Sequence, residues 1–170
     1  MKYGLAVKPT DYWETPYEDF ARMNSLLNFT LDAAATATNR KVAKFFSEED
    51  DGLEQSWKGE TVWCNPPYSK GHLKAWTEKA LREAIYNKVA SCLLIPHDTS
   101  TQWWRDNVIG SGSGAAVPSP FGLDRGAYAY ATSWGHVVVI PLTTRVRFLK
   151  DGKKQGTPTF ASVYVIYWPY

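Results

Sequence analysis

The chain has 170 residues, a formal net charge of +2, 44% hydrophobic and 21% charged residues. This length and composition predict one globular domain, spanning 1–170, that buries a core without disulfides or structural metal. No apolar run approaches the roughly 20 residues that span a bilayer, so we expect no membrane partner. Cys64 and Cys92 both lie in apolar runs, which is typical of reduced core cysteines in a cytoplasmic protein. The histidines share no metal-ligand spacing with them, so no metal site is expected.

The first part of the chain alternates helical and strand-like patterns. After a polar lead-in, apolar spacing predicts helices at 17–27 and 72–87. Strands are predicted at 28–31, 42–46, 61–64 and 89–95. The last of these is uninterrupted and apolar, as in a sheet that is covered on both faces. This alternation predicts an α/β domain with a mostly parallel sheet.

The second part of the chain follows a different pattern. Strands are predicted at 137–140, 145–149 and 160–168. Asp151-Gly152 is a hairpin turn signal, although we expect a connection longer than two residues. Segment 110–135 is rich in Gly, Ser, Pro and Tyr without a clear period, which predicts a long loop or insertion.

Polar residues follow three of the predicted parallel strands, namely Asp32, Asp50 or Asp51, and Asn65. Each alone suits a cap or a turn, but open parallel sheets bind ligands at this edge. A carboxylate after the second strand is a natural acceptor for ribose hydroxyls. Neither G-x-G-x-x-G nor a P-loop is present, which counts against dinucleotides and nucleoside triphosphates. A nucleoside ligand without phosphates, such as S-adenosylmethionine, remains compatible.

The run Asn65-Pro66-Pro67-Tyr68 ends the third predicted strand. The Asn65 side-chain oxygen and the Pro66 carbonyl can accept both hydrogens of a planar amine, which frees the nitrogen lone pair for attack on a methyl group. The prolines fix the backbone, and Tyr68 can stack on the ring that carries the amine. This chemistry works by positioning and electrostatics and needs no strong base.

This run is similar to the [DNS]-PP-[YFW] motif of amino-methyltransferases, and the chain resembles the compact phage-type DNA adenine methyltransferases (the Dam family). The matching pieces, in chain order, are Asp11-x-Trp13-x-Thr15-Pro16, Phe29-Thr30-Leu31-Asp32-Ala33-Ala34-Ala35-Thr36, Asp51-Gly52-Leu53-x-Gln55-x-Trp57, Val62-Trp63-Cys64-Asn65-Pro66-Pro67-Tyr68-Ser69 and Arg145-Val146-Arg147-Phe148. The resemblance covers nearly the whole chain except about 110–135. The run after Asp32 lacks the glycines of the usual methyltransferase cofactor loop, as in this family.

The resemblance implies a Rossmann-like methyltransferase fold, with an antiparallel C-terminal hairpin and helices on both faces of the sheet. It implies S-adenosylmethionine as cofactor and S-adenosylhomocysteine as product. The implied cofactor-binding residues are Trp13, Thr15, Pro16, Asp32, Ala33, Ala34, Asp50 or Asp51, and Asn65. The implied catalytic residues, which hold the target adenine, are Asn65, Pro66, Pro67 and Tyr68. Arg145, Arg147 and Phe148 would line the target-base side.

DNA is the partner that this resemblance implies. Basic side chains on the predicted hairpin would contact phosphates, namely Arg145, Arg147, Lys150, Lys153 and Lys154. Arg125, in the predicted loop, is a candidate base reader. The predicted reaction methylates the exocyclic N6 amine of an adenine flipped out of double-stranded DNA, with Tyr68 as its stacking partner. The expected location is the cytoplasm of a phage's bacterial host, in protection from restriction or in regulation.

Two alternatives remain open from the residues. NPPY also occurs in enzymes that methylate RNA bases or protein glutamines. The richness in aromatic residues, with eight Trp and ten Tyr, also suits a non-catalytic DNA- or glycan-binding module. A pure binding module has no use for an amine clamp, so the motif disfavours it.

Overall fold

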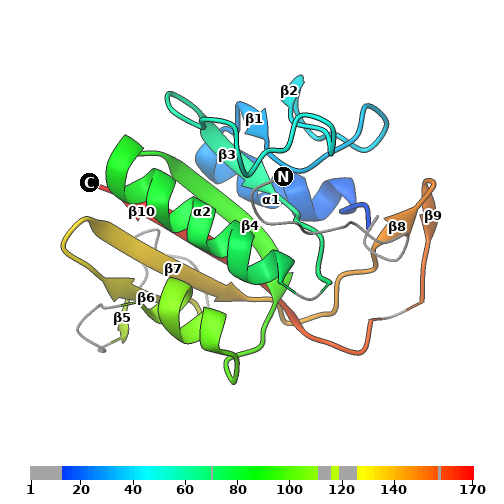
Figure 1. Ribbon diagram of the computed structural model, residues 1–170. Coiled ribbons are helices and arrows are strands. Elements are labelled where there is room, and N and C mark those ends of the chain that lie inside the picture. Colours follow the sequence, from blue (N-terminus) through cyan, green and yellow to red (C-terminus); the bar gives the residue numbers. More distant parts are fainter. Residues whose placement is uncertain (1–12, 70, 111–115, 119–125, 157) are drawn as a thin grey trace.

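A computed structural model of the chain describes residues 13–69, 71–110, 116–118, 126–156 and 158–170 (Figure 1). An eight-stranded mixed sheet, in the order β2-β1-β3-β4-β10-β7-β6-β5, forms its centre. Its strands are β1 Leu31–Asp32, β2 Lys44–Phe45, β3 Thr61–Cys64, β4 Ala90–Pro96, β5 Ala116–Pro118, β6 Tyr128–Ala131, β7 Gly135–Pro141 and β10 Ser162–Pro169. The remaining elements are the helices α1 Tyr17–Leu27 and α2 His72–Asn87, the π-helix η2 Trp104–Ile109, and a separate hairpin of β8 Leu149–Lys150 and β9 Lys153–Lys154.

The sheet has a parallel half and an antiparallel half. β2, β1, β3 and β4 run parallel to one another. β10 is antiparallel to both of its neighbours, β4 and β7, and β6 and β5 continue the antiparallel pairing. The predicted α/β class with a mostly parallel sheet is therefore confirmed: β7 and β5 run in the same direction as β1 to β4, and only β10 and β6 of the described strands run in the opposite direction.

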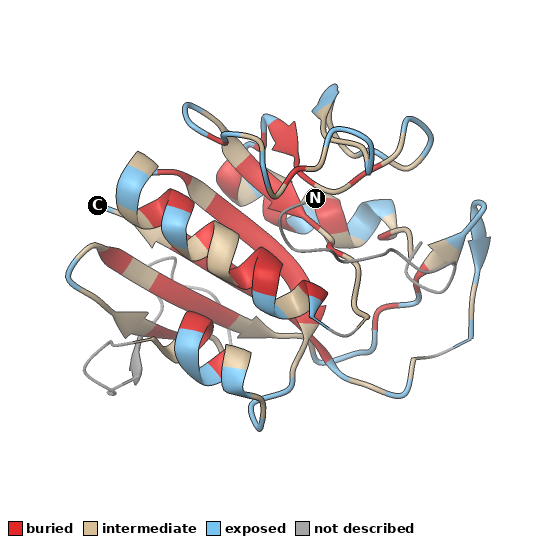
Figure 2. Cartoon of the chain, in the orientation of Figure 1, coloured by how far each residue is buried: buried red, intermediate tan, exposed pale blue. Residues whose placement is uncertain are grey.

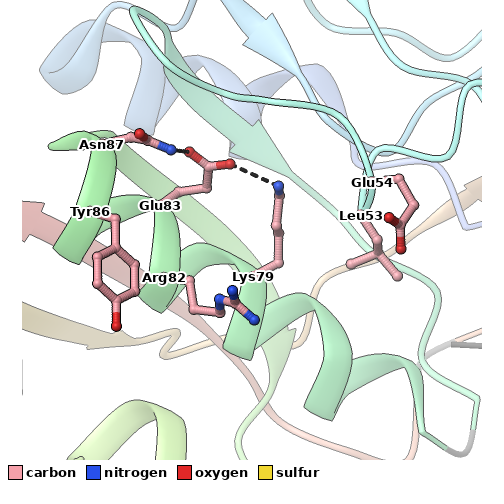
Figure 3. A pocket seen from close by; sticks show the side chains of 7 residues that line it. All are labelled: Leu53, Glu54, Lys79, Arg82, Glu83, Tyr86 and Asn87. Atoms are coloured by element: carbon pink, nitrogen blue, oxygen red, sulfur yellow. Dashed lines mark hydrogen bonds and ion pairs between the residues drawn. The ribbon is translucent and has the colours of Figure 1, made fainter. Parts of the chain in front are cut away.

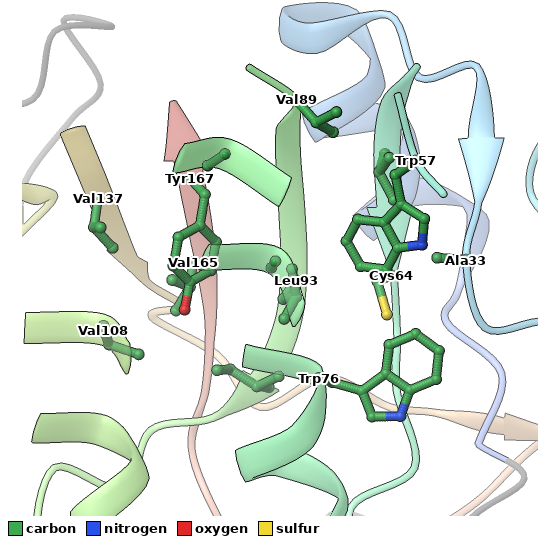
Figure 4. Packing of buried hydrophobic residues seen from close by; sticks show 14 of the residues in the cluster. Ala33, Trp57, Cys64, Trp76, Val89, Leu93, Val108, Val137, Val165 and Tyr167 are labelled. Atoms are coloured by element: carbon green, nitrogen blue, oxygen red, sulfur yellow. The ribbon is translucent and has the colours of Figure 1, made fainter. Parts of the chain in front are cut away.

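Helices cover the two faces of the sheet. Alternate residues of β4 point to opposite sides, so Leu93 and Ile95 join one buried cluster while Cys92 and Leu94 join the other. α2 and η2 pack on the first face and α1 packs on the second, as the ribbon shows (Figure 1). Trp57, Trp76 and Tyr167 fill much of the first cluster (Figure 4). The central strands are buried along most of their length (Figure 2).

Both predicted α-helices form with the predicted bounds because their end signals are local. α1 ends at Asn28, whose φ of 53° is left-handed and whose N–H donates to the Asn24 carbonyl. α2 begins after Gly71, with φ of 91°, and ends before Lys88, with φ of 58°. At each of these positions the left-handed residue interrupts the helical backbone conformation.

Three expectations for the second part of the chain are corrected. Segment 110–135, expected as a long loop or insertion, contains the strands β5 and β6 of the sheet, and Ala129 of β6 is fully buried. Residues 145–148 form no paired strand, although Val146 and Phe148 are buried. The Asp151-Gly152 turn is a minimal two-residue connection: both residues have positive φ, 52° and 71°, which suits the twist of the hairpin.

Candidate active site

Asp32 and Asn65 meet at the carboxyl edge of the parallel half. Asp32 pairs in register with Trp63 of the neighbouring β3, and Asn65 is the first residue after that strand. The turn after β1 is tied to both neighbours: the Ala33 N–H donates to the Trp63 carbonyl at 2.9 Å, and the Ala35 N–H donates to the Phe46 carbonyl at 3.0 Å. The structure thus brings together two predicted strand-end residues.

Asp32 is a buried carboxylate with one unused oxygen. Its side chain is 3% exposed, and its Oδ2 accepts the Lys41 N–H at 3.0 Å. Its Oδ1 has no hydrogen-bond partner among the described residues. Burial raises the pKa of Asp32 from 3.8 to about 6, because the charged form loses solvation. A buried acceptor without a protein partner, at the carboxyl edge of a parallel sheet, is suited to accept a hydrogen bond from a bound molecule.

Hydrogen bonds fix the orientation of the Asn65 amide. Its Nδ2 donates to the Trp13 carbonyl at 2.7 Å, so Oδ1 is the group left to accept. Tyr68 Oη lies 2.8 Å from that Oδ1 and 2.9 Å from the Leu94 carbonyl. A hydroxyl has one proton, so it serves one of these acceptors at a time. Burial raises the pKa of Tyr68 well above its usual value, which keeps it a neutral donor.

Aromatic rings surround Tyr68. Its ring meets Phe148 at 6.0 Å and Phe160 at 5.7 Å, both nearly edge-on. Phe148 also lies 6.0 Å from Trp13 and is 2% exposed, so it packs in the core rather than on an open surface. Phe160 is not among the predicted site residues, although its place as the one aromatic residue in the polar stretch 155–161 is a signal in the sequence.

The segment 13–16 reaches the site from the N-terminal side. The N–H and carbonyl of Glu14 exchange two hydrogen bonds of 2.8 Å with Leu149. Thr15 is buried, and Pro16 precedes α1 as its N-cap residue. Motif pieces from three distant parts of the sequence, at 13–16, 65–68 and 145–149, therefore lie side by side.

The two candidate ribose acceptors after β2 have different surroundings. Asp50 is exposed, and its Oδ2 accepts from the N–H and hydroxyl of Ser47 at 2.8 and 2.7 Å, which lowers its pKa. Asp51 has a left-handed φ of 53°. Next to it, Gly52 approaches the turn after β1 so closely that a Cβ there would lie 2.2 Å from the Ala33 carbonyl oxygen. Only glycine allows this contact between the two loops.

The predicted DNA-binding cations lie on the exposed surface. Arg145 donates from Nη1 to the Pro158 carbonyl at 2.9 Å. Arg147, Lys150, Lys153 and Lys154 are exposed as well. Within the described ranges the two ion pairs are Lys44–Glu60 and Lys79–Glu83, neither of which involves this hairpin. Arg125 lies outside the described residues.

A cavity of about 220 Å³ lies away from this edge, between α2 and the loop after β2 (Figure 3). Its lining residues are Leu53, Glu54, Lys79, Arg82, Glu83, Tyr86 and Asn87. No cluster of three His, Cys, Asp or Glu residues suited to a metal ion occurs in the described part of the chain. No described helix is both long enough and apolar enough to cross a membrane.

The fold and the site define an α/β protein with a buried carboxylate and an oriented amide at one edge of a parallel sheet. Its sequence matches the family described as DNA N-6-adenine-methyltransferase (Dam) over residues 4–111, and the chain belongs to this family. The matched region contains the Asp32 and Asn65 turns and ends before β5. It therefore does not include the basic hairpin.

Two phage proteins are similar to this chain, and both are named DNA N-6-adenine-methyltransferase. That of Escherichia phage T1 is 36% identical over 98 residues, which cover 56% of this chain and 40% of the relative. That of Haemophilus phage HP1 (strain HP1c1) is 31% identical over 96 residues, which cover 55% of this chain and 54% of the relative. The match thus spans about half, or less, of the length of these relatives.

Proposed function

We propose that this chain is an S-adenosylmethionine-dependent methyltransferase that modifies the N6 amine of adenine in double-stranded DNA. The observation that carries the proposal is the Asn65 amide, which the Trp13 carbonyl orients so that Oδ1 accepts. Membership of the Dam family and the names of the two phage relatives support adenine in DNA as the substrate. The order of the sheet, with antiparallel β10 between β4 and β7, supports a Rossmann-like methyltransferase fold.

The residues at the carboxyl edge fit the cofactor. The free Oδ1 of Asp32 suits a hydroxyl or ammonium donor, and the small side chains of Ala33 and Ala34 allow a ligand to approach the backbone. Asp51 is the better ribose acceptor after β2, because Ser47 already occupies one oxygen of Asp50. Trp13, Thr15 and Pro16 close the same edge. S-adenosylmethionine would supply a methyl group that its sulfonium makes electrophilic.

The amine would be held by two fixed acceptors, Asn65 Oδ1 and the Pro66 carbonyl. Accepting both amine hydrogens draws the nitrogen towards tetrahedral geometry and directs its lone pair at the methyl carbon. The Tyr68 hydroxyl can donate to the Leu94 carbonyl instead of Asn65 Oδ1. Oδ1 is then available to the amine, and the hydroxyl keeps a hydrogen bond. The nitrogen becomes cationic on methylation and then releases its proton, so no strong base is required.

The DNA would approach from the side of the basic hairpin. Adenine N6 is paired inside a duplex, so the base must flip out to reach Asn65, with Tyr68 beside it. Arg145, Arg147 and the three hairpin lysines would contact phosphates, which are read by charge rather than by sequence. A phage enzyme of this kind would act in the cytoplasm of the bacterial host.

Tritiated methyl transfer to DNA, RNA and protein tests this proposal directly. We expect label on N6 of adenine in duplex DNA, and label formed about a hundredfold more slowly, or slower still, with Asn65→Ala. Label on RNA or on glutamine would favour the other NPPY enzymes. Binding of DNA without binding of S-adenosylmethionine would instead indicate a non-catalytic module.

A further inference from the structure

A buried ion pair on α2 lies beside the loop that follows β2. Lys79 Nζ is 2.7 Å from Glu83 Oε1, and the two side chains are only 15% and 5% exposed. The Glu83 carboxylate also accepts from Asn87 Nδ2 at 2.7 Å through its other oxygen (Figure 3). Surface ion pairs contribute little to stability, and even buried pairs are often replaceable by apolar residues. The net contribution of this pair to the stability of the core is therefore expected to be small.

Both members of the pair contact the backbone of the loop. Lys79 Nζ donates to the Gln55 carbonyl at 2.6 Å and lies 5.5 Å from the centre of the Trp57 ring. Glu83 Oε1 accepts the Trp57 N–H at 3.3 Å. Because the pair is nearly inaccessible to water, these charge-assisted hydrogen bonds hold the backbone of the loop at residues 55–57 in position against α2.

Trp57 carries this constraint to the candidate cofactor site. Its indole Nε1 donates to the Gly52 carbonyl at 3.0 Å, and its ring stacks on Trp76 of α2 at 6.3 Å. Gly52 in turn lies so close to the Ala33 carbonyl oxygen that there is no space for a side chain on Gly52. A continuous series of contacts therefore leads from Glu83 through Trp57 and Gly52 to the turn after Asp32.

We propose that Lys79 and Glu83 are positioning residues for the cofactor: through Trp57 and Gly52 they hold Asp51 beside the Asp32 turn. The inference rests on the proposed binding of S-adenosylmethionine at that edge. According to this inference, the ion pair on α2 contributes to the affinity for the cofactor although it lies outside the predicted site. The contacts of the pair are with protein groups of the loop and of α2, outside the residues proposed to touch the cofactor or the base, so the pair should affect the affinity for the cofactor and leave the rate at saturation unchanged.

The first test replaces both charges, Lys79→Met with Glu83→Leu, so that no buried charge is left unpaired. Titration calorimetry measures S-adenosylmethionine affinity, and urea unfolding measures stability. The loop loses two of its hydrogen bonds to α2, so we expect affinity to fall about tenfold, with the KM for cofactor rising and kcat unchanged. Lys44→Met, which breaks the exposed Lys44–Glu60 pair, is the matched control and should bind normally.

The second test removes the hydrogen bond in the middle of the series. Trp57→Phe deletes the donor to Gly52 and keeps an aromatic ring, and we expect roughly fivefold weaker cofactor binding. Trp104→Phe is its control, because Trp104 is equally buried in the same cluster and its Nε1 has no hydrogen-bond partner in the described chain. Hydrogen exchange of amides 47–55 should accelerate in Trp57→Phe and not in Trp104→Phe.

The outcomes separate this inference from the proposed function. If wild-type protein binds S-adenosylmethionine and the double variant binds it equally well, the positioning role is wrong and the proposed function stands. Equal losses in Trp57→Phe and Trp104→Phe would also overturn it, since general loosening of the core would then suffice. Wild-type protein that does not bind the cofactor overturns the proposed function and this inference together.

Discussion

The parallel and antiparallel halves of the sheet differ in what they carry, and the outer strands of the parallel half are the shortest of the sheet. β1 and β2 have two residues each and β3 has four, whereas β4 of the same half has seven and β7 and β10 have seven and eight. The predicted cofactor and amine-binding residues follow the short strands. Residues 163–167 of β10 are fully buried and include no predicted site residue. The long strands of the antiparallel half contribute buried residues to the core. The segment between β7 and β10 contains the exposed basic hairpin.

The loops that follow the short strands β1, β2 and β3 depend on side-chain hydrogen bonds for their positions. Two-residue strands offer few ladder hydrogen bonds, so hydrogen bonds between side chains and backbone groups add to them. Asn65 bonds to the Trp13 carbonyl, Trp57 to the Gly52 carbonyl, and Asp32 to the Lys41 N–H. Substitutions in the parallel half should therefore change ligand handling first. Those in the antiparallel half and its hairpin should change stability or general DNA affinity.

The largest effect is expected from Asn65→Ala. The variant loses one of two amine acceptors, and we expect turnover to fall about a hundredfold or more, as when one oxyanion-hole donor is removed. Cofactor affinity should stay near that of the wild type, because Asp32 and its turn are unchanged. Single-turnover methyl transfer and calorimetry measure the two quantities. Equal losses of rate and cofactor affinity would show that Asn65 builds the cofactor pocket instead.

Asp32→Asn should separate binding from stability. Because its pKa is raised to about 6 in the folded protein, Asp32 contributes stability below pH 4 that is lost as the pH rises through 6. Above that pH its buried charge costs on the order of 3 kcal/mol, which asparagine avoids. We expect the variant to be more stable than wild type at pH 8 and equal to it at pH 4. Cofactor affinity at pH 8 should fall roughly tenfold or more.

Asp50→Asn is the control for this prediction, because Asp50 is exposed and its pKa is lowered rather than raised. It should not gain stability as the pH rises. Urea unfolding across pH 4–8 gives both curves. An Asp32→Asn variant that binds cofactor normally would remove Asp32 from the cofactor site.

Local signals in the sequence determine much of the parallel half. The sequence predicts the bounds of α1 and α2 to the residue, since helical spacing and turn residues such as Asn28 and Gly71 act within a few positions. The place of Asn65 after β3 is predictable for the same reason. β6 is not predicted although Tyr128 to Ala131 alternate in size, because its identity as a strand depends on pairing with β7.

The contacts that complete the candidate site are not predictable from one sequence. The bond from Asn65 to Trp13 spans 52 positions, and the packing of Phe160 on Tyr68 depends on the path of the whole C-terminal part. Phe148, predicted at the target-base side, is buried and packs on both Trp13 and Tyr68. Chain order indicates which residues share an edge, and only tertiary packing determines which atoms touch.

The basic hairpin of β8 and β9 is expected to bind DNA through its positive charges and without sequence preference. Replacing Lys150, Lys153 and Lys154 by alanine should weaken binding to matched and scrambled duplexes alike. The slope of log affinity against log salt should shrink by about 0.9 for each phosphate that the hairpin no longer neutralises. A control variant removes three exposed charges elsewhere: Lys58→Ala, Arg82→Ala and Lys88→Asn. If both variants change the salt slope equally, net charge accounts for the effect and the hairpin has no special place in the interface.

The smallest effect is expected from Tyr68→Phe. This substitution compares the contribution of the Tyr68 hydroxyl with that of its ring. The hydroxyl bonds within the parallel half, to Asn65 and Leu94, while the ring packs on Phe148 and Phe160. Losing the hydroxyl should lower the free energy of unfolding by about 1 kcal/mol, the net contribution of one hydrogen bond.

Tyr164→Phe is the matched control for this loss, since the Tyr164 hydroxyl makes one bond of 2.9 Å to the Asp19 carbonyl in the same buried cluster. We expect the two variants to lose similar stability. Methylation by Tyr68→Phe should stay within about threefold of wild type, because Asn65 Oδ1 no longer has a competing donor and a single such bond contributes only about 1 kcal/mol. A drop in rate as large as that of Asn65→Ala would mean that the hydroxyl, rather than the ring, acts on the amine.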